Sequence, residues 1–345
     1  MTKFSKALRR TEQNVPPIWF MRQAGRYHKH YQKIRAKHEF IDMCKNPELA
    51  AEVTMGPIED FDYDVAILFS DLLFPLEALG MGLTYEPGPK LDRALTPHNL
   101  KALKSVEEAV SQLTFQGDAM RLIRQRLPKE KGLIGFVGGP WTLFSYAVSP
   151  LDAKRPEFFA TNSIAAKADL DFFANFSELM IELLIENIHL QLEGGADVVM
   201  IFDPAAGVLS PTLFQHYVAP GIARLAKNFS GQLGYYSKET NVEHFGPHLL
   251  DLKDLAGIGV DHRQNVPDLL VKRTTGFVQG NFDQALLFAE PSVLKKRVLE
   301  FLTPFRNMEP KKRAGWVCGL GHGVLPQTPE DNVKLFIDIV RETFK

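Results

Sequence analysis

The sequence predicts a (β/α)8 barrel, the TIM-barrel fold, formed as a single domain by residues 1–345. Short apolar runs alternate with longer amphipathic segments along the whole chain. The runs are continuously apolar, which is typical of parallel strands buried on both faces. Eight such runs occur, and parallel strands need helical crossovers of the kind that lie between them. The chain is also longer than the roughly 250 residues that such a barrel commonly needs.

The eight predicted strands begin near turn-forming residues and end near polar ones. They are 16–21 (PPIWFM), 65–70 (VAILFS), 132–138 (GLIGFVG), 197–203 (DVVMIFD), 232–237 (QLGYYS), 257–261 (GIGVD), 276–281 (GFVQGN) and 315–321 (GWVCGLG). The fifth and sixth runs are the least distinct. An open, doubly wound sheet is the alternative architecture, because it also alternates parallel strands with helices.

Helix-like segments lie between the runs. Residues 172–195 carry apolar side chains at three- and four-residue spacing, and a Gly-Gly pair supplies a C-terminal stop. The segment 291–302 begins with proline, which a first helical turn tolerates. In the segment 328–344 we expect Thr328 as the N-cap and Pro329 as the first helical residue, with acidic side chains following.

The charge balance excludes a general affinity for polyanions. The 40 Lys and Arg residues nearly cancel the 41 Asp and Glu residues. No overall positive field would therefore hold nucleic acid or an anionic membrane. An anionic ligand would need a local cluster of cations instead.

Cysteine content and hydropathy indicate the compartment. Only Cys44 and Cys318 occur, which excludes a disulfide framework and a multi-cysteine zinc site and favours a reducing environment. No apolar run reaches the roughly 18 residues of a membrane helix. The basic opening MTKFSKALRR is followed by polar TEQN, so we expect a short helix there rather than a secretory signal. These features predict a cytoplasmic protein.

Polar and reactive side chains follow the predicted strands, whereas turn-forming residues precede them. In a barrel the carboxyl ends of the strands meet at one rim, where the catalytic loops lie. We therefore expect one reactive rim that includes Arg22, Arg26, Asp71, Tyr146, Asp203, Ser237, Lys238, Asp261, His262, Asn281, Asp283 and His322.

The first rim loop, in IWFMRQAGRY (18–27), is a candidate anion site. Guanidinium groups bind carboxylate or phosphate through paired N–H donors. Arg22 and Arg26 would share one face if the loop were helical. Gly25 would let the loop backbone approach a ligand closely. The alternative is a solvated arginine pair, which would contribute little.

Three further side chains are candidates for the site, and the first two each have two interpretations. Asp71, between two apolar runs in ILFSDLLFP, either accepts hydrogen bonds from a ligand or pairs with backbone amides or an arginine. Tyr146 either presents its hydroxyl to the site or packs in the core. His322 lies between glycines and can exchange a proton near neutral pH. The nearby Cys318 is predicted to be a buried structural thiol.

Five stretches together resemble the uroporphyrinogen decarboxylases of haem biosynthesis. They are PPIWFMRQAGRY, ILFSDLLFPLEALGMG, GFVGGPWTLFSY, VQGNFDQALLFAEP and GLGHGVLPQTPEDNV, and the resemblance spans almost the whole chain. It implies a single-domain (β/α)8 barrel, usually a homodimer, that uses no metal and no organic cofactor. The implied reaction converts the four acetate side chains of the tetrapyrrole uroporphyrinogen III to methyls, giving coproporphyrinogen III and four CO2.

The resemblance also implies the site residues. It places the substrate against Arg22, Gln23, Ala24, Gly25, Arg26, Asp71, Tyr146 and His322. Asp71, Arg22, Tyr146 and His322 would take part in catalysis. A protonated pyrrole is its own electron sink, and Asp71 is suited to accept hydrogen bonds from the pyrrole N–H groups and to stabilise the cation. The arginines are assigned chiefly to binding, and the proton donor stays open between His322, Tyr146 and an arginine.

Two positions depart from the family pattern. Pro204 stands in IFDPAAG where the family usually has serine or threonine, so one hydrogen bond to the substrate is lost or supplied elsewhere. His262 stands in GVDHRQ where the family commonly has tryptophan. Neither change removes a charged group, so we expect altered affinity rather than a lost reaction.

Two other functions are compatible with these features. A zinc-dependent methyltransferase of the same barrel superfamily would use a His-x-Cys pair and a later cysteine. The fifth predicted strand carries GYYSKET, which has neither residue. A non-catalytic tetrapyrrole-binding protein would keep the pocket without reacting, and Asp71 would then be dispensable.

Overall fold

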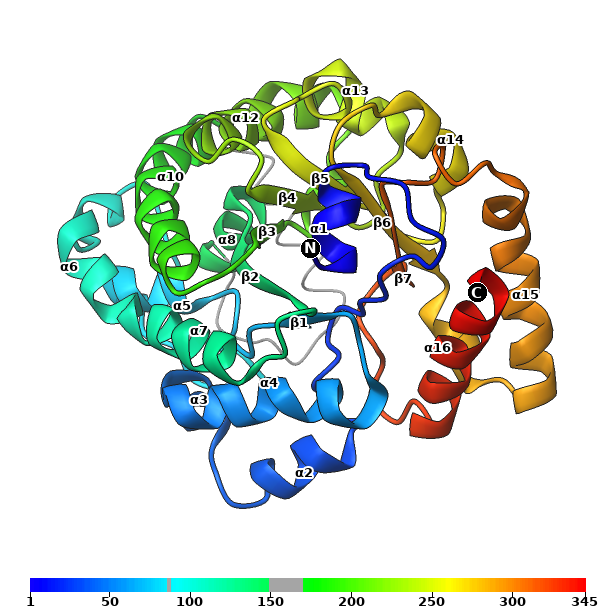
Figure 1. Ribbon diagram of the computed structural model, residues 1–345. Helices are drawn as coiled ribbons and strands as arrows, with labels where there is room; N and C mark the ends of the chain where they lie inside the picture. Colours follow the sequence, from blue (N-terminus) through cyan, green and yellow to red (C-terminus); the bar gives the residue numbers. More distant parts are fainter. Residues whose placement is uncertain (86–87, 149–169) are drawn as a thin grey trace.

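A computed structural model describes residues 1–85, 88–148 and 170–345. Within these ranges the centre is a curled sheet of seven parallel strands, as Figure 1 shows. The strands are β1 (Val65–Ile67), β2 (Gly132–Gly138), β3 (Val198–Phe202), β4 (Leu233–Tyr236), β5 (Leu255–Gly259), β6 (Phe277–Phe282) and β7 (Trp316–Leu320). Each overlaps one predicted run, so seven of the predicted strands are confirmed.

The predicted first strand, 16–21, forms only an isolated bridge, so an eight-stranded barrel is not confirmed for the described residues. Ile18 pairs with Cys318 of β7. The Trp19 N–H donates to the Cys318 carbonyl at 3.1 Å, and on the other side the Asp64 N–H donates to the Ile18 carbonyl at 3.1 Å. The two prolines before Ile18 have no N–H to donate, which limits the ladder to this single point.

The strand order excludes the open, doubly wound alternative for this sheet. Neighbours follow the chain from β1 to β7 without a reversal. A doubly wound sheet instead reverses its strand order at a switch point. A sequential order is what the winding of a barrel requires, and it brings all the carboxyl ends of the strands to one side.

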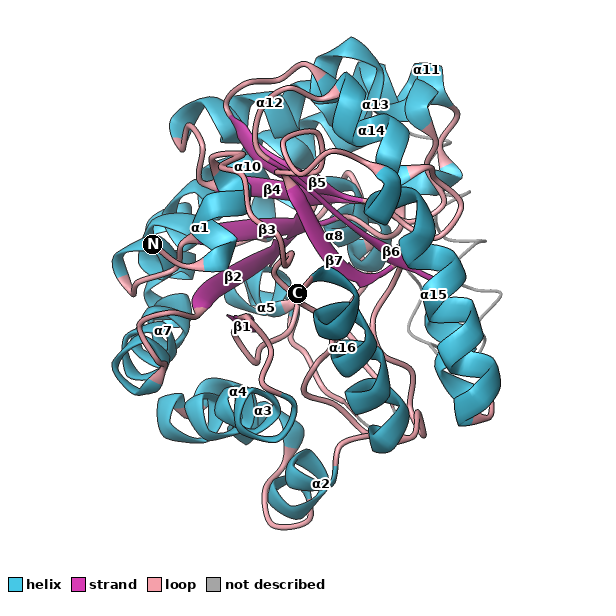
Figure 2. Ribbon diagram, turned by 45° about the vertical axis from the view of Figure 1, so that its right-hand side comes forward, coloured by secondary structure: helices cyan, strands magenta, loops and turns pink. Residues whose placement is uncertain are grey.

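Helices connect the strands and surround the curled sheet (Figures 1 and 2). The α-helices are α1 (Lys3–Leu8), α2 (Lys29–Arg35), α3 (Phe40–Lys45), α4 (Pro47–Phe61), α5 (Phe74–Leu76), α6 (Val106–Val110), α7 (Thr114–Arg126), α8 (Pro140–Ala147), α10 (Leu170–Glu193), α11 (Pro211–Leu213), α12 (Ala219–Asn228), α13 (Val242–Leu250), α14 (Val266–Lys272), α15 (Pro291–Asn307) and α16 (Glu330–Phe344). Every helix of the described ranges is too short or too polar to cross a membrane.

The three predicted helices are confirmed, with one correction at an end. The segment 172–195 is α10, and Gly195 follows it with a φ of 106°. The segment 291–302 lies within the longer α15. The start predicted for the last helix is wrong, because Pro329 is its N-cap and not its first helical residue. Thr328 lies one residue before this N-cap, and its hydroxyl donates to the Leu325 carbonyl at 2.8 Å.

The short leading helix is also confirmed, and it covers the N-terminal end of the sheet. Phe4 of α1 is buried against Gly132 at the start of β2, where a Cβ would lie 2.7 Å from the Phe4 ring. The same ring lies 5.8 Å from that of Phe277 at the start of β6. This packing occupies the N-terminal end of the strands and leaves their carboxyl ends for a site.

Candidate active site

The loops after the strands pack against one another at the carboxyl end of the sheet. Four glycines in these loops have no room for a Cβ, because it would lie 2.0 to 2.5 Å from an atom of another loop. The pairs in contact are Gly139 with Asp203, Gly207 with Lys238, Gly321 with His262, and Gly323 with Arg22. Loops from distant parts of the sequence therefore form a connected rim, as the barrel prediction requires.

The charge of Arg22 acts on three of the other predicted site residues. Arg22 is exposed, and its backbone has a φ of 59°. Burial is the largest influence on the pKa of Asp71, Tyr146 and His322, and the Arg22 charge lowers the pKa of all three. Four segments far apart in the sequence thus place these side chains within electrostatic range of one guanidinium.

The second arginine of the loop, Arg26, is placed differently. Residues 22–26 form turns and bends rather than a helix, so the condition under which the two arginines would share a helical face is not met. The left-handed backbone of Arg22 is incompatible with a continuous α-helix. Arg26 is exposed, its carbonyl accepts a hydrogen bond from the Gln32 side chain at 2.8 Å, and its charge acts on the pKa of Tyr31.

Gln23 fastens the arginine loop to β1. Its amide donates to the Val65 carbonyl at 3.1 Å and accepts from the Ile67 N–H at 3.3 Å, and the side chain is buried. Ala24 and Gly25 are half-buried in the same loop. A Cβ on Gly25 would make only ordinary contacts, the nearest 3.5 Å away, so the protein itself does not require glycine there.

Asp71 follows β1 and is half-buried. Its carboxylate accepts a hydrogen bond from the Leu73 N–H at 2.8 Å. Burial raises the pKa of Asp71, while the Leu73 N–H, the Tyr85 hydroxyl and the Arg22 charge oppose that rise. The backbone interpretation of Asp71 is thus confirmed in part, and the same carboxylate also lies near the arginine.

Buried polar side chains hold the Asp71 loop in place. The Gln116 amide of α7 donates to the Ser70 hydroxyl at 2.9 Å. Gln191 of α10 donates to the Gln116 side-chain carbonyl at 3.4 Å and accepts from the Phe136 N–H at 2.7 Å. Sequence reasoning missed these glutamines. A signal was present, because Gln191 occupies the apolar face of α10.

Asp203, at the end of β3, holds the first turn of α8, the helix that carries Tyr146. Its carboxylate accepts from the Thr142 N–H at 2.7 Å and from the Thr142 hydroxyl at 2.6 Å. The Tyr235 hydroxyl donates to the other carboxylate oxygen at 3.3 Å. Asp203 is fully buried, and burial raises its pKa to about 6. Asp203 thus positions α8, while burial raises the pKa of Tyr146 to about 12.

His322 follows β7 and is half-buried. Its Nδ1 lies 2.9 Å from the hydroxyl of Tyr236, a buried residue of β4. Burial, followed by the Arg22 and Lys238 charges, lowers the pKa of His322 to about 4. The imidazole is therefore neutral at neutral pH. Its pKa lies below the near-neutral range in which we predicted that it exchanges a proton. Cys318 on β7 is buried, as predicted.

The remaining predicted rim residues are mostly structural. Asp261 is buried and accepts hydrogen bonds from the Glu239 N–H at 2.7 Å and the Arg263 N–H at 3.0 Å. The Asn281 amide donates to the Asp261 carbonyl at 2.7 Å. The Asp283 side chain accepts from the Ala285 N–H at 3.0 Å. These side chains fix loop geometry at the rim.

The two departures from the family pattern lie in the rim loops. Pro204 is half-buried directly after Asp203, and it has neither a hydroxyl nor an N–H to donate. His262 is exposed, and its backbone N–H packs against Gly321. Ser237 follows β4, the strand next to β3. Its hydroxyl is buried and donates to the Asp203 carbonyl at 3.0 Å.

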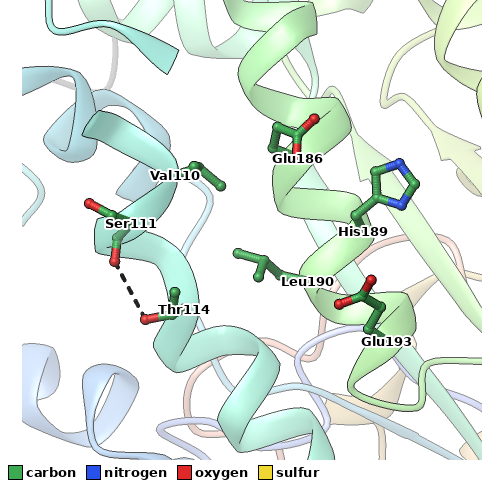
Figure 3. Close-up of a pocket in the computed structure, with 7 residues that line it drawn as sticks. All are labelled: Val110, Ser111, Thr114, Glu186, His189, Leu190 and Glu193. Atoms are coloured by element: carbon green, nitrogen blue, oxygen red, sulfur yellow. Dashed lines mark hydrogen bonds between the residues drawn. The ribbon is translucent and has the colours of Figure 1, made fainter. Parts of the chain in front are cut away.

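A pocket between the outer helices is separate from this rim. Figure 3 shows its lining residues, which come from α6, α7 and α10 and the turn between the first two: Val110, Ser111, Thr114, Glu186, His189, Leu190 and Glu193. It contains none of the predicted site residues, and its two glutamates would repel an anion. Among the described residues, no three His, Cys, Asp or Glu side chains are grouped so that they could hold a metal ion.

Comparison with known proteins identifies the family. The model of the family described as uroporphyrinogen decarboxylase (URO-D) matches residues 1–343. The chain belongs to the uroporphyrinogen decarboxylase family. A uroporphyrinogen decarboxylase of Trichlorobacter lovleyi is 35% identical over 334 residues, which covers 94% of this chain and 93% of that protein. One of Chloroflexus aurantiacus is 36% identical over 357 residues, with coverages of 98% and 95%.

The resemblance to uroporphyrinogen decarboxylases is thus confirmed over the whole chain. Family membership supports a carboxy-lyase activity on uroporphyrinogen in porphyrin biosynthesis. A solved structure of a methyltransferase from Methanosarcina mazei aligns with a TM-score of 0.80 over 100% of both chains, at 19% sequence identity. At that identity the likeness shows the fold alone.

Proposed function

We propose that this chain removes carboxyl groups from the four acetate side chains of uroporphyrinogen III, giving coproporphyrinogen III and four CO2. The observation that carries the proposal is the grouping of Asp71, Tyr146 and His322 around Arg22 at the rim of a uroporphyrinogen decarboxylase-family chain. The substrate carries eight carboxylates, so a protein with a formal net charge of −1 must bind it through local cations.

The arginine loop binds substrate carboxylates. Arg22 and Arg26 are both exposed, and each guanidinium can form two parallel hydrogen bonds to one carboxylate. A charge-assisted hydrogen bond contributes roughly 1.5–3 kcal/mol net. Ala24 and Gly25 border the substrate through their backbone, and Gln23 acts by holding the loop on β1.

Asp71 accepts hydrogen bonds from the pyrrole N–H groups and stabilises the cation that forms during the reaction. Protonation of a ring carbon gives an iminium cation, which takes up the electron pair of the breaking C–C bond as CO2 leaves. The methylene carbon is then protonated to a methyl, and the ring carbon loses the proton that it had gained, which restores the pyrrole. A preorganised carboxylate acts most strongly where water is excluded, and Asp71 is half-buried with a fixed Leu73 contact.

Tyr146 and His322 act as neutral hydrogen-bonding groups. A pKa of about 12 keeps the Tyr146 proton in place at neutral pH, so its hydroxyl can donate to a substrate carboxylate. A pKa of about 4 leaves His322 without the charge that a proton donor would need. We therefore assign the proton donor to Arg22 or to a water near the substrate.

We extend the proposal to the architecture and the assembly. Residues 17–19 complete an eight-stranded barrel, which is supported by hydrogen bonds to β7 on one side and to Asp64 on the other. Residues 1–345 form a single domain, and the chain works as a cytoplasmic homodimer without metal or organic cofactor. Light scattering of the purified protein measures the dimer, and treatment with a chelator should leave its rate unchanged.

The reaction is tested by anaerobic incubation with uroporphyrinogen III and separation of the products by carboxylate number. We expect intermediates with seven, six and five carboxylates, followed by the four-carboxylate product. Binding of uroporphyrinogen without turnover would indicate the non-catalytic binding protein instead. Stoichiometric zinc in the purified protein, with no decarboxylation, would favour the methyltransferase alternative.

A further inference from the structure

The Tyr236 hydroxyl contacts two groups at once. Its oxygen lies 2.8 Å from the carbonyl oxygen of Gly321 and 2.9 Å from Nδ1 of His322. The Tyr236 and His322 rings are stacked, with centroids 6.0 Å apart and planes 15° from parallel. Tyr236 is only 1% exposed, so these two contacts are made away from solvent.

The two contacts fix where the protons lie. A hydroxyl has one proton, and a carbonyl oxygen can only accept a hydrogen bond. The Tyr236 proton must therefore point to Gly321. The contact with His322 is then a hydrogen bond only if Nδ1 carries a proton and donates it to the Tyr236 oxygen. The opposite arrangement would leave the buried carbonyl facing a lone pair, at a cost of about 1–3 kcal/mol.

We propose that Tyr236 is a positioning residue that holds His322 in its Nδ1–H tautomer, so that Nε2 faces the substrate as a hydrogen-bond acceptor. The charged groups near the imidazole are the cations Arg22 and Lys238 and the anions Asp261 and Glu239. Burial and the two cations disfavour a second proton on the ring. Nε2 has no hydrogen-bond partner among the described residues.

An acceptor nitrogen at this place selects the kind of group that it binds. A substrate carboxylate is itself only an acceptor, so it cannot bond to an unprotonated Nε2. A pyrrole N–H of the porphyrinogen can, either directly or through one water. This part of the inference rests on the proposed function, whereas the tautomer of the free protein does not.

The tautomer is tested by NMR of the full chain with 15N-labelled histidine, with the His322 signals assigned by comparison with the H322Q variant. We expect Nδ1 to give the signal of a protonated nitrogen and Nε2 that of an unprotonated one. Y236F should shift the signals toward the Nε2–H tautomer that free histidine prefers in water. An Nε2–H signal in the wild type, or an unchanged His322 in Y236F, would overturn the proposal.

Y235F is the matched control. Tyr235 is the neighbouring residue of β4, and its hydroxyl bonds to Asp203 rather than to His322. The same atom is therefore lost from the same strand, and the His322 signals should not change. A shift in Y235F equal to that in Y236F would show that the effect is a general loosening of β4, which also contradicts the proposal.

Anaerobic titration with coproporphyrinogen III tests the acceptor role. We expect the Nε2 signal to move on binding, and the Kd of Y236F to rise by about threefold to tenfold, the loss of one hydrogen bond. Binding that leaves Nε2 unmoved would contradict an acceptor role. If coproporphyrinogen does not bind the wild type, the proposed function fails, while the tautomer measurement on the free protein still stands.

Discussion

Asp203 and Thr142 are joined by two hydrogen bonds that link the end of β3 to the first turn of α8. The carboxylate accepts from the Thr142 N–H at 2.7 Å and from its hydroxyl at 2.6 Å. The Thr142 oxygen in turn accepts from the Ala205 N–H at 3.1 Å. Because α8 carries Tyr146, the position of that hydroxyl in the site depends on a fully buried acid from another strand.

The pH dependence of stability should reveal Asp203. Burial raises its pKa to about 6, whereas an unfolded aspartate titrates near pH 3.9. Between these values the folded state holds the proton and the unfolded state does not, so the contribution of Asp203 to stability falls as pH rises from 4 to 6. D203N keeps the bonds to Thr142 without titrating.

Urea unfolding at pH 4 and pH 7 measures this contribution. Relative to the wild type, we expect the free energy of unfolding of D203N to improve by about 2 kcal/mol between the two pH values. The Asn side chain can still accept from Thr142 and donate to the Tyr235 oxygen, so the variant should fold. Parallel pH curves for the two proteins would show that Asp203 does not titrate in this range.

Gly323 sets the position of the Arg22 side chain. A Cβ at residue 323 would lie 2.5 Å from Cδ and 2.7 Å from Cγ of Arg22, so G323A must displace the guanidinium. We expect KM for uroporphyrinogen to rise at least about tenfold, as for one lost charge-assisted hydrogen bond. G88A is the control, because a Cβ there meets no atom of the described residues within 4 Å. An unchanged KM in G323A would argue against carboxylate binding by Arg22.

Gln23 should matter for stability as well as for binding. Q23A leaves the Val65 carbonyl and the Ile67 N–H of β1 without their buried partner. We expect a loss of about 2 kcal/mol in the free energy of unfolding, since unpaired buried groups cost roughly 1–3 kcal/mol each. Q32A removes an exposed side chain from the same region, and surface changes of this kind usually stay within about 0.5 kcal/mol. Equal losses in the two variants would contradict the anchoring role.

The sequence predicts most of the strands and the long helices because their signal is local. Continuous apolar runs report strands buried on both faces, as for 132–138, and three- and four-residue spacing reports α10. The predictions fail where contacts with other parts of the chain determine the structure. The run 16–21 is apolar, but its prolines and its single pairing with Cys318 restrict it to one bridge. The last helix starts one residue later than the local signal indicates, with Pro329 as its N-cap, while the Thr328 hydroxyl donates to the Leu325 carbonyl.

The residues of the candidate site also fall into two groups, those that the sequence predicts and those that it does not. Arg22, Asp71, Tyr146 and His322 can be predicted because each follows a recognisable apolar run and belongs to a motif of the family. The residues that orient them cannot, since their partners are distant in the chain. Asp203 is 61 residues from Thr142, and Tyr236 is 86 residues from His322. Only the winding of the sheet brings such pairs together.

The decisive measurement is the turnover of D71N. An amide keeps the shape of Asp71 but not the charge that would stabilise the pyrrole cation, so we expect kcat to fall at least about 100-fold. The Kd for coproporphyrinogen should change by less than about tenfold, because Arg22 remains. D254N is the matched control, since Asp254 directly precedes β5 at the opposite end of the strands and bonds to Ser230. A folded D71N with kcat within a few-fold of the wild type would contradict the catalytic role of Asp71.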